Sequence, residues 1–343
     1  MIRRTVPQKT ISKQISLSGV GLHTGKHVNI TFKPAPADTG LVFVRDDVDG
    51  DNLINAHIKY ISNTDRGTNL DNGLFRIHTS EHVLAAITGL DIDNCFICLD
   101  GPEVPIMDGS SKFFINALEQ AKIVEQNVLR EEFFPSEPIS YLCEDTGSKI
   151  SILPDDNYRV NTLVDYKTKV LGEQEASINH ISEFKKEISS ARTFSFLHEL
   201  ETLLENGLIK GGDLNNAIVY VDKPLAESNM EILKKAFNKE SISVTPNGIL
   251  DNLDLHYPNE AARHKLLDVI GDLALIGMKI RGKVIAEKPG HSINAKFAKK
   301  VSEVIKLDRK NTLPNINFKK KPLMDSNQIM KVIPHRPPFL LID

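Results

Sequence analysis

The residues of this chain best suited to chemistry begin with a polar stripe in residues 261–277, AARHKLLDVIGDLALIG. Its apolar residues recur at helical spacing, while His264, Asp268 and Asp272 occupy every fourth position. An imidazole and two carboxylates therefore stack along one face of a predicted helix. A polar stripe on a helix is often simply solvated, so this segment alone leaves a solvent-facing surface as one interpretation.

A second segment, residues 78–86 (HTSEHVLAA), makes a metal site the stronger interpretation. Glu81 directly precedes His82 at the start of another apolar helix. Catalytic zinc commonly has three protein ligands and a position for water, and a separate carboxylate takes the proton of that water. His82, His264 and Asp268 are thus candidate ligands, and Glu81 is the candidate base.

A third segment, residues 288–297 (KPGHSINAKF), presents His291 after a glycine, in a context typical of functional loops.

Two alternatives use the same residues. His78 to His82 matches H-x-x-E-H, the inverted zinc-peptidase motif, which needs both histidines on one helical face. With Thr79 as the predicted N-cap and Ser80 as the first helical residue, His78 falls outside the helix. The other alternative is a structural zinc protein, but such sites are usually closed by four ligands and rich in cysteine. This chain has three cysteines, none within the constellation.

The composition excludes several classes of protein. With 343 residues the chain is long enough for about two domains, and it is 41% hydrophobic and 25% charged, as globular proteins are. With a net charge of −3, the chain lacks the basic excess that is typical of proteins that bind nucleic acid. No apolar run approaches the roughly 20 residues of a membrane span, and no signal sequence is visible, so we expect a cytoplasmic protein. The few cysteines agree with a reducing compartment.

Short strands and helices alternate without strict βαβ order, which favours an α+β fold. We predict strands at 27–32, 40–46, 94–100, 148–154, 158–166, 216–222 and 283–287. We predict helices at 80–88, closed by Gly89 at C′, at 111–123 after an N-cap at Ser110, and near 195–206. The charged, proline-containing segment 128–138 marks a domain boundary, and no internal repeat is legible. We expect domains at 1–130 and 131–305, then a linker at 306–325.

Seven blocks of the chain resemble one enzyme family. They are GVGLHTGKHVNITFKPAPADTG, TSEHVLAAITGLDIDN, PEVPIMDGSS, ARTFSF, GLIKGG, RHKLLDVIGDLALIG and KPGHSINAKF. In this order, from about residue 3 to about residue 300, they resemble the UDP-3-O-acyl-N-acetylglucosamine deacetylases (LpxC) of lipid A biosynthesis. The resemblance implies two α+β sandwich domains, each a sheet packed on helices, with the active site between them.

The resemblance also implies a Zn²⁺ amidohydrolase that deacetylates an acylated, UDP-linked glucosamine. By position, the family's zinc ligands correspond to His82, His264 and Asp268, and its general base to Glu81. By the same correspondence, His291 is the general acid and Asp272 its partner, and Thr193 and Lys265 lie near the oxyanion and the substrate. Tyr166, Phe194 and Phe196 correspond to aromatic residues of the uridine pocket, although a role in the core fits these three residues equally well. The family also uses the segment around FLHELETLLENGLI to line a passage for the acyl chain, although from the sequence alone ordinary core packing is the favoured explanation of its leucines. No role is derived for His23 or His78.

The last residues, 326–343, resemble the start of another family. Their IMKVIPHRPPFLLID is similar to the opening block of the β-hydroxyacyl-carrier-protein dehydratases (FabZ). We therefore expect the chain to be the front part of a bifunctional fusion, with oligomerisation through the missing dehydratase domain. An apolar tail that packs on the deacetylase is the alternative.

Overall fold

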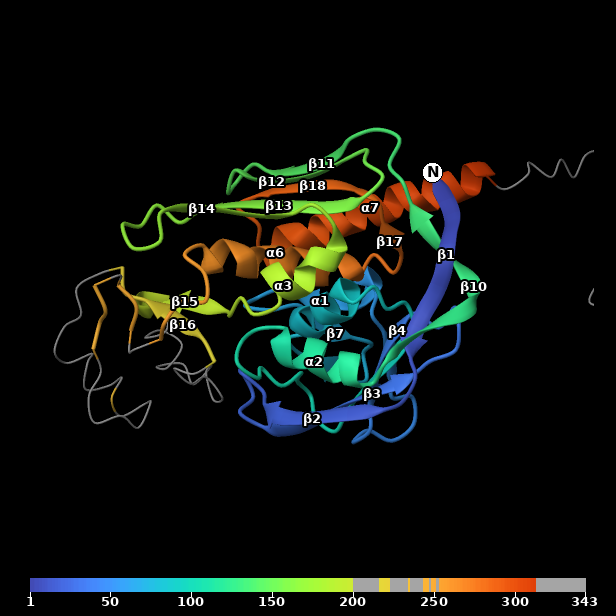
Figure 1. Cartoon of the computed structure of the whole chain (residues 1–343), viewed down its shortest axis with the longest axis horizontal. Coiled ribbons are helices and arrows are strands. Elements are labelled where there is room, and N and C mark those ends of the chain that lie inside the picture. Colours follow the sequence, from blue (N-terminus) through green and yellow to red (C-terminus); the bar gives the residue numbers. More distant parts are fainter. Residues whose placement is uncertain (200–215, 223–233, 235–242, 247, 251–252, 313–343) are drawn as a thin grey trace, which may run out of the picture. The chain divides into compact units, whose positions relative to one another are not determined.

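A computed structural model describes residues 1–199, 216–222, 234, 243–246, 248–250 and 253–312 of the chain (Figure 1). Met1–Ile305 form one compact unit, and Lys306–Asp343 form a second. Every described residue of the candidate site belongs to the first unit. No helix within the described ranges is long and apolar enough to cross a membrane.

Two five-stranded sheets of the first unit have the same topology, which confirms an α+β fold built from two similar halves. The first has the order β2-β3-β9-β4-β5 and the second the order β11-β12-β18-β13-β14. In each sheet the strand that comes last in the chain occupies the centre. It pairs antiparallel with one neighbour and parallel with the other. The two halves therefore repeat in strand order, although no repeat is legible in the sequence.

The sequence predicts the three inner strands of each sheet, with bounds that agree to within two residues, but it does not predict the outer strands β2, β5, β11 and β14. The first sheet comprises β2 (Ile15–Val20), β3 (His27–Pro34), β4 (Leu41–Arg45), β5 (Leu53–Asn55) and β9 (Cys95–Leu99). The second comprises β11 (Ile139–Cys143), β12 (Ser148–Leu153), β13 (Tyr158–Asp165), β14 (Glu173–Ile178) and β18 (Gly282–Glu287). Along β13 every second residue is buried, the period expected when one face of a sheet meets a core.

Helices cover the inner face of each sheet and meet in the middle of the unit. They are α1 (Glu81–Gly89), α2 (Lys112–Gln120), α3 (Phe184–Glu187), α6 (Glu260–Ala274) and α7 (His291–Thr312). In Figure 1 the second sheet lies above α6 and α7, while α1 and α2 lie between these helices and β2 and β3 of the first sheet. In each half one helix comes before the central strand in the chain: α1 directly before β9, and α6 before β18 with the short strand β17 (Lys279–Ile280) between them. These two helices pack against each other.

Smaller strand groups complete the unit. A ribbon pairs β1 (Ile2–Ile11) with β10 (Ile123–Phe133), which also pairs with β17 (Lys279–Ile280). A three-stranded sheet contains β6 (Ile61–Asn63), β7 (Asn69–Asp71) and β8 (Arg76–Ile77). The parallel pair β15 (Phe194–Phe196) and β16 (Ile218–Tyr220) lies beside α6. The helix expected near 195–206 thus begins with a strand. Residues 197–199 are helical, and residues 200–206 lie outside the described ranges.

The expected helix ends need correction. The N-caps are Ser80 for α1 and Ser111 for α2, each one residue after the predicted cap. Gly89 is the last residue of α1 rather than a left-handed C′ residue, and Asp91 has the positive φ, 58°. Gly89 is small for another reason, since a Cβ there would lie 2.6 Å from Cγ of the Phe184 ring.

The predicted domain limits fall within two of these elements. The limit at 130/131 lies inside β10, and the linker expected from residue 306 begins inside α7, which continues to Thr312. Residues 313–343, with the dehydratase-like block, lie outside the described ranges.

The contact between α1 and α6 depends on Gly271. A Cβ at this position would overlap the carbonyl oxygen of Glu81 and would lie 2.8 Å from its carbonyl carbon and 3.0 Å from its Cα. The obstacle is backbone, which cannot rotate away as a side chain can. Glycine is therefore required where α6 crosses the first turn of α1, and this crossing sets the distance between the functional residues of the two helices.

We expect Gly271→Ala to push the two helices apart. Overpacking of this kind costs about 1–3 kcal/mol of unfolding free energy, which urea denaturation would measure. The matched control is Gly290→Ala, because a Cβ at Gly290 meets no atom within 4 Å and the backbone there is not left-handed. Equal stability of the two variants would contradict the role given to Gly271.

Candidate active site

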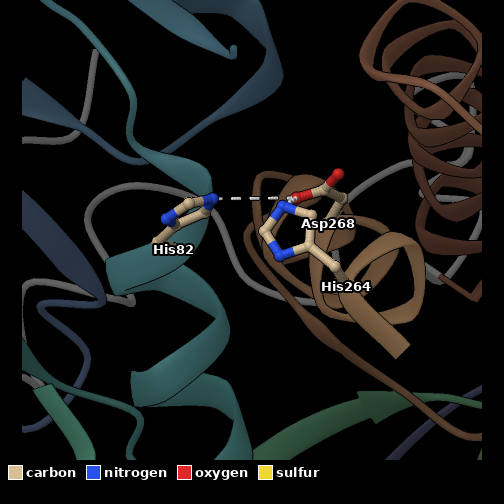
Figure 2. A group of neighbouring side chains, drawn as sticks. All are labelled: His82, His264 and Asp268. Atoms are coloured by element: carbon tan, nitrogen blue, oxygen red, sulfur yellow. Dashed lines mark ion pairs between the residues drawn. The ribbon is translucent and has the colours of Figure 1, made fainter. Parts of the chain in front are cut away.

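Three buried side chains from α1 and α6 converge on one point. His82 comes from α1, and His264 and Asp268 come from successive turns of α6 (Figure 2). One ligand atom of each lies within 4.8 Å of the others. Asp268 Oδ1 is 3.4 Å from His264 Nε2 and 3.9 Å from His82 Nε2. The three residues predicted as metal ligands are therefore brought together.

The chemistry of this donor set fits a divalent metal ion. Nδ1 of His264 donates to the Ala191 carbonyl oxygen at 3.1 Å, so Nε2 of the neutral ring carries a free lone pair. Among the described residues, Oδ1 of Asp268 has no hydrogen-bond donor although it is fully buried. Ligation requires neutral imidazoles and an ionised carboxylate, and a buried oxygen without a donor is costly unless a cation faces it.

The protonation states agree with this fit. Burial, with a contribution from the neighbouring His264, lowers the pKa of His82 to about 3, and burial also lowers the pKa of His264. Burial opposes ionisation of Asp268, but the Lys265 ammonium, 2.8 Å from Oδ2, and the surrounding imidazoles hold the pKa of this carboxyl well below its usual range.

Glu81 lies beside the three donors as the first residue of α1. It is buried, and its Oε2 accepts the backbone N–H of Thr68 at 2.9 Å. Burial raises the pKa of Glu81 to about 7, although the nearby His291 charge opposes this change. A carboxylate that titrates near neutral pH is well suited to accept a proton.

His291 begins α7 and forms an ion pair with Asp272. Its Nδ1 is 2.9 Å from Asp272 Oδ2, and its Nε2 is 3.9 Å from Asp268 Oδ2. Burial disfavours the charged ring, but the carboxylates of Asp272 and Asp268 outweigh this cost and raise the pKa of His291 to about 9. The ring is therefore an imidazolium at neutral pH and can give up a proton.

Two residues that sequence reasoning missed hold these groups in place. The Thr68 hydroxyl donates to Asp272 Oδ1 at 2.5 Å, while its backbone N–H binds Glu81. The Asn294 amide donates to Asp272 Oδ2 at 2.8 Å. Asn294 lies three residues after His291, one turn along α7, but the sequence predicts a functional loop there and not a helix, so this spacing gave no signal. Thr68 lies in an irregular segment and had none.

The residues predicted for the substrate lie next to the donor set. Lys265 Nζ is 5.4 Å from the centre of the Phe194 ring, and this ring lies 6.2 Å from the His264 ring. Tyr166 contacts Phe194 and Phe196 at centroid distances of 5.6 and 5.3 Å. The three aromatic residues therefore form one cluster beside α6.

Thr193 lies close in the chain to Ala191, which contacts α6. It follows the Ala191 carbonyl that holds His264 by two residues, and its backbone N–H donates to the Gly109 carbonyl.

His78 lies apart from the three donors, before the start of α1. Its Nδ1 contacts Asn69 Oδ1 at 3.1 Å. The inverted peptidase motif needs His78 and His82 on one helical face, and a helix that begins at Glu81 does not provide it.

His23 belongs to a loop held by a buried carboxylate. Glu103 accepts the backbone N–H groups of His23 and Thr24 at 3.0 and 2.8 Å and the Thr79 hydroxyl at 3.0 Å. It ties this loop to the residues that precede α1, where Thr79 has a φ of 57°.

A buried set of two imidazoles and one carboxylate, with a separate carboxylate and a protonated imidazole beside it, is typical of metal-dependent hydrolases. Comparison with known proteins identifies the family. The family model described as LpxC, UDP-3-O-acyl N-acetylglycosamine deacetylase, matches residues 8–233 and 226–303. The chain therefore belongs to the LpxC family, a family of deacetylase enzymes, and the resemblance seen in the sequence is confirmed.

Individual relatives have two kinds of name. A bifunctional enzyme LpxC/FabZ of Bacteroides thetaiotaomicron is 41% identical over 336 residues, covering 98% of this chain and 73% of the relative. The same-named protein of Porphyromonas gingivalis is 43% identical, with coverages of 98% and 72%. A UDP-3-O-acyl-N-acetylglucosamine deacetylase of Myxococcus xanthus is 38% identical over 296 residues, covering 86% of each chain.

The donor set generates a prediction about bound metal. We expect His82→Ala and Asp268→Ala to weaken metal binding by more than the roughly 10–100-fold that loss of an outer partner costs, because each removes a direct ligand. Elemental analysis after gel filtration would measure the bound metal. His78→Ala is the matched control and should keep the full metal content, and stoichiometric loss in that variant would instead support the inverted motif.

Proposed function

We propose that this protein is a Zn²⁺-dependent deacetylase that hydrolyses the acetamide of UDP-3-O-acyl-N-acetylglucosamine, a step of lipid A biosynthesis. The observation that carries the proposal is the buried donor set of His82, His264 and Asp268, with Glu81 and the His291–Asp272 pair beside it. Membership of the LpxC family and the names of its relatives support the substrate.

His82, His264 and Asp268 would hold the metal ion. When bound, Zn²⁺ polarises the amide carbonyl and lowers the pKa of water to about 7. Glu81 takes one proton from the attacking water, whose oxygen forms a bond with the acetyl carbon. The C–N bond then breaks, the His291 imidazolium donates its proton to the leaving nitrogen, and the products are acetate and a free amine. The raised pKa of each of these two side chains suits its task.

The remaining predicted residues would bind the substrate. The Thr193 hydroxyl donates a hydrogen bond to the oxygen that becomes negative during attack, where loss of one such donor costs about 3 kcal/mol. The Lys265 ammonium supplies positive charge close to the same region. Burial disfavours this charge, but the Asp268 carboxylate outweighs the effect of burial and raises the pKa of Lys265. Tyr166, Phe194 and Phe196 offer an apolar, aromatic surface for the uridine.

Other expectations from the sequence stay predictions. They are the cytoplasmic location, the absence of nucleic-acid partners, the domain limits, and oligomerisation through a dehydratase domain that begins at residue 326.

We expect Glu81→Gln to keep its bound zinc and to lose turnover by about 10²–10⁴-fold, because it removes the proton acceptor and no ligand. The measurement is hydrolysis of the acylated UDP-sugar, followed by acetate release, with metal analysis of the same preparation. A wild-type protein that binds zinc but releases no acetate would refute the proposed function. Full turnover in Glu81→Gln would refute only the role of Glu81.

The activity should show a bell-shaped dependence on pH, since Glu81 must be ionised and His291 protonated. Activity is lost as pH rises through the pKa of His291, which Asp272 raises. We therefore expect Asp272→Asn to move the alkaline limb of kcat to lower pH. Because Asp272 also raises the pKa of Glu81, the acid limb should move in the same direction.

The control for this profile is Asp155→Asn, which breaks an ion pair with Arg159 at the opposite end of the second sheet. It should leave both limbs in place. An alkaline limb that does not move in Asp272→Asn would show that this carboxylate does not keep His291 protonated.

A further inference from the structure

The polar stripe of α6 begins one turn before the residues that could bind metal, at Glu260. This carboxylate is fully buried, and it lies four residues before His264 on the same face of the helix. Neither the three donors nor the proton-transfer groups include it. A buried carboxylate in line with three functional residues therefore needs an explanation of its own.

Glu260 and His264 hold the two ends of one peptide unit. The backbone N–H of Arg192 donates to Glu260 Oε1 at 3.0 Å, and the carbonyl of Ala191 accepts from His264 Nδ1 at 3.1 Å. These N–H and C=O groups belong to the same planar peptide bond, and all four residues are buried. The peptide is thus bracketed by two side chains one turn apart on α6.

The position of Glu260 is itself tightly determined. Its two oxygens also accept Nε and Nη2 of the Arg192 guanidinium at 2.9 and 3.2 Å and the backbone N–H of His256 at 2.7 Å. Arg192 Nη2 in turn donates to the Asp254 carbonyl at 2.7 Å. With four donors on one carboxylate, Glu260 has little freedom to rotate, and the peptide that it holds is fixed as firmly.

We propose that Glu260 is a positioning residue for His264, and that it acts through the Ala191–Arg192 peptide to present Nε2 of that ring to the metal ion. The inference rests on the proposed function, because it assigns His264 as a ligand. A carbonyl oxygen only accepts hydrogen bonds, so the bond to Ala191 places the ring proton on Nδ1. The negative charge on the N–H side polarises the peptide, which makes the Ala191 oxygen a stronger acceptor and the His264 ring a better ligand.

The first test compares Zn²⁺ affinity, measured by competition with a chelator, in the wild type and in Glu260→Gln. We expect binding to weaken by about 10–100-fold, as for other partners that orient a metal-binding histidine. The matched control is Glu132→Gln. Glu132 is an equally buried glutamate paired with Arg281 at 2.9 Å, but it lies on β10. If both ion pairs are merely structural, the two variants lose stability alike and both keep their Zn²⁺ affinity.

A charge-balanced variant covers the case in which Glu260→Gln does not fold. Glu260→Gln combined with Arg192→Gln removes both buried charges and leaves no unpaired guanidinium. It should fold and still bind Zn²⁺ more weakly than the wild type. Wild-type affinity in either variant would overturn the proposal.

The second test needs no variant. Nitrogen chemical shifts of His264 in the metal-free wild type report which ring nitrogen carries the proton, and we expect it on Nδ1. On addition of Zn²⁺ the Arg192 amide proton should shift, because the hydrogen bonds on the two sides of the peptide are coupled. A proton on Nε2, or an Arg192 amide that does not respond, would overturn the role of Glu260. If His264→Ala kept full Zn²⁺ affinity, the ligand assignment of the proposed function would fail instead.

Discussion

The backbone contact between Gly271 of α6 and Glu81 of α1 is the constraint on which the candidate site depends. The two helices come from the two halves of the unit, and each carries some of the candidate functional residues. Because a Cβ at Gly271 would overlap the Glu81 carbonyl, only glycine lets the first turn of α1 approach α6 this closely. At this separation the imidazole of His82 reaches Asp268, and Glu81 lies within the influence of the His291 charge. A wider crossing would leave two partial sites.

The same close packing buries the carboxylates of the stripe on α6, which is unfavourable for charged groups. A cationic partner for each carboxylate offsets this cost. Glu260, Asp268 and Asp272 are all buried carboxylates, and each has a cation of its own. The partners are Arg192, Lys265 and His291, at 2.9, 2.8 and 2.9 Å. A buried carboxylate without a partner would take up a proton instead of remaining ionised. The pairing thus keeps Asp268 available as an anionic donor and His291 available as an acid, while burial keeps His264 neutral although Asp268 lies 3.4 Å from its ring.

Much of this arrangement could be predicted from residue types and spacing. The polar stripe, the Glu81–His82 pair and the inner strands of the two five-stranded sheets follow from period and from chemistry, and His82, His264 and Asp268 do meet. The contacts made by Thr68, Glu103 and the Ala191–Arg192 peptide could not be predicted, because they join backbone groups of segments far apart in the chain. From its low helix propensity, Gly271 is expected only to destabilise the helix that contains it. Its value appears when the second helix is in place.

The repeated topology of the two sheets explains why the site lies where it does. In each half one helix comes before the central strand in the chain, and these two equivalent helices, α1 and α6, pack against each other. The halves are equivalent in connection but not in chemistry, since α1 contributes one candidate ligand and the candidate base while α6 contributes two ligands and the partner of the acid. Because neither helix carries three donors, the metal site can form only when both halves have folded and met. Metal binding would therefore favour the assembled state of the unit over either half alone, since a ligand stabilises the state that binds it.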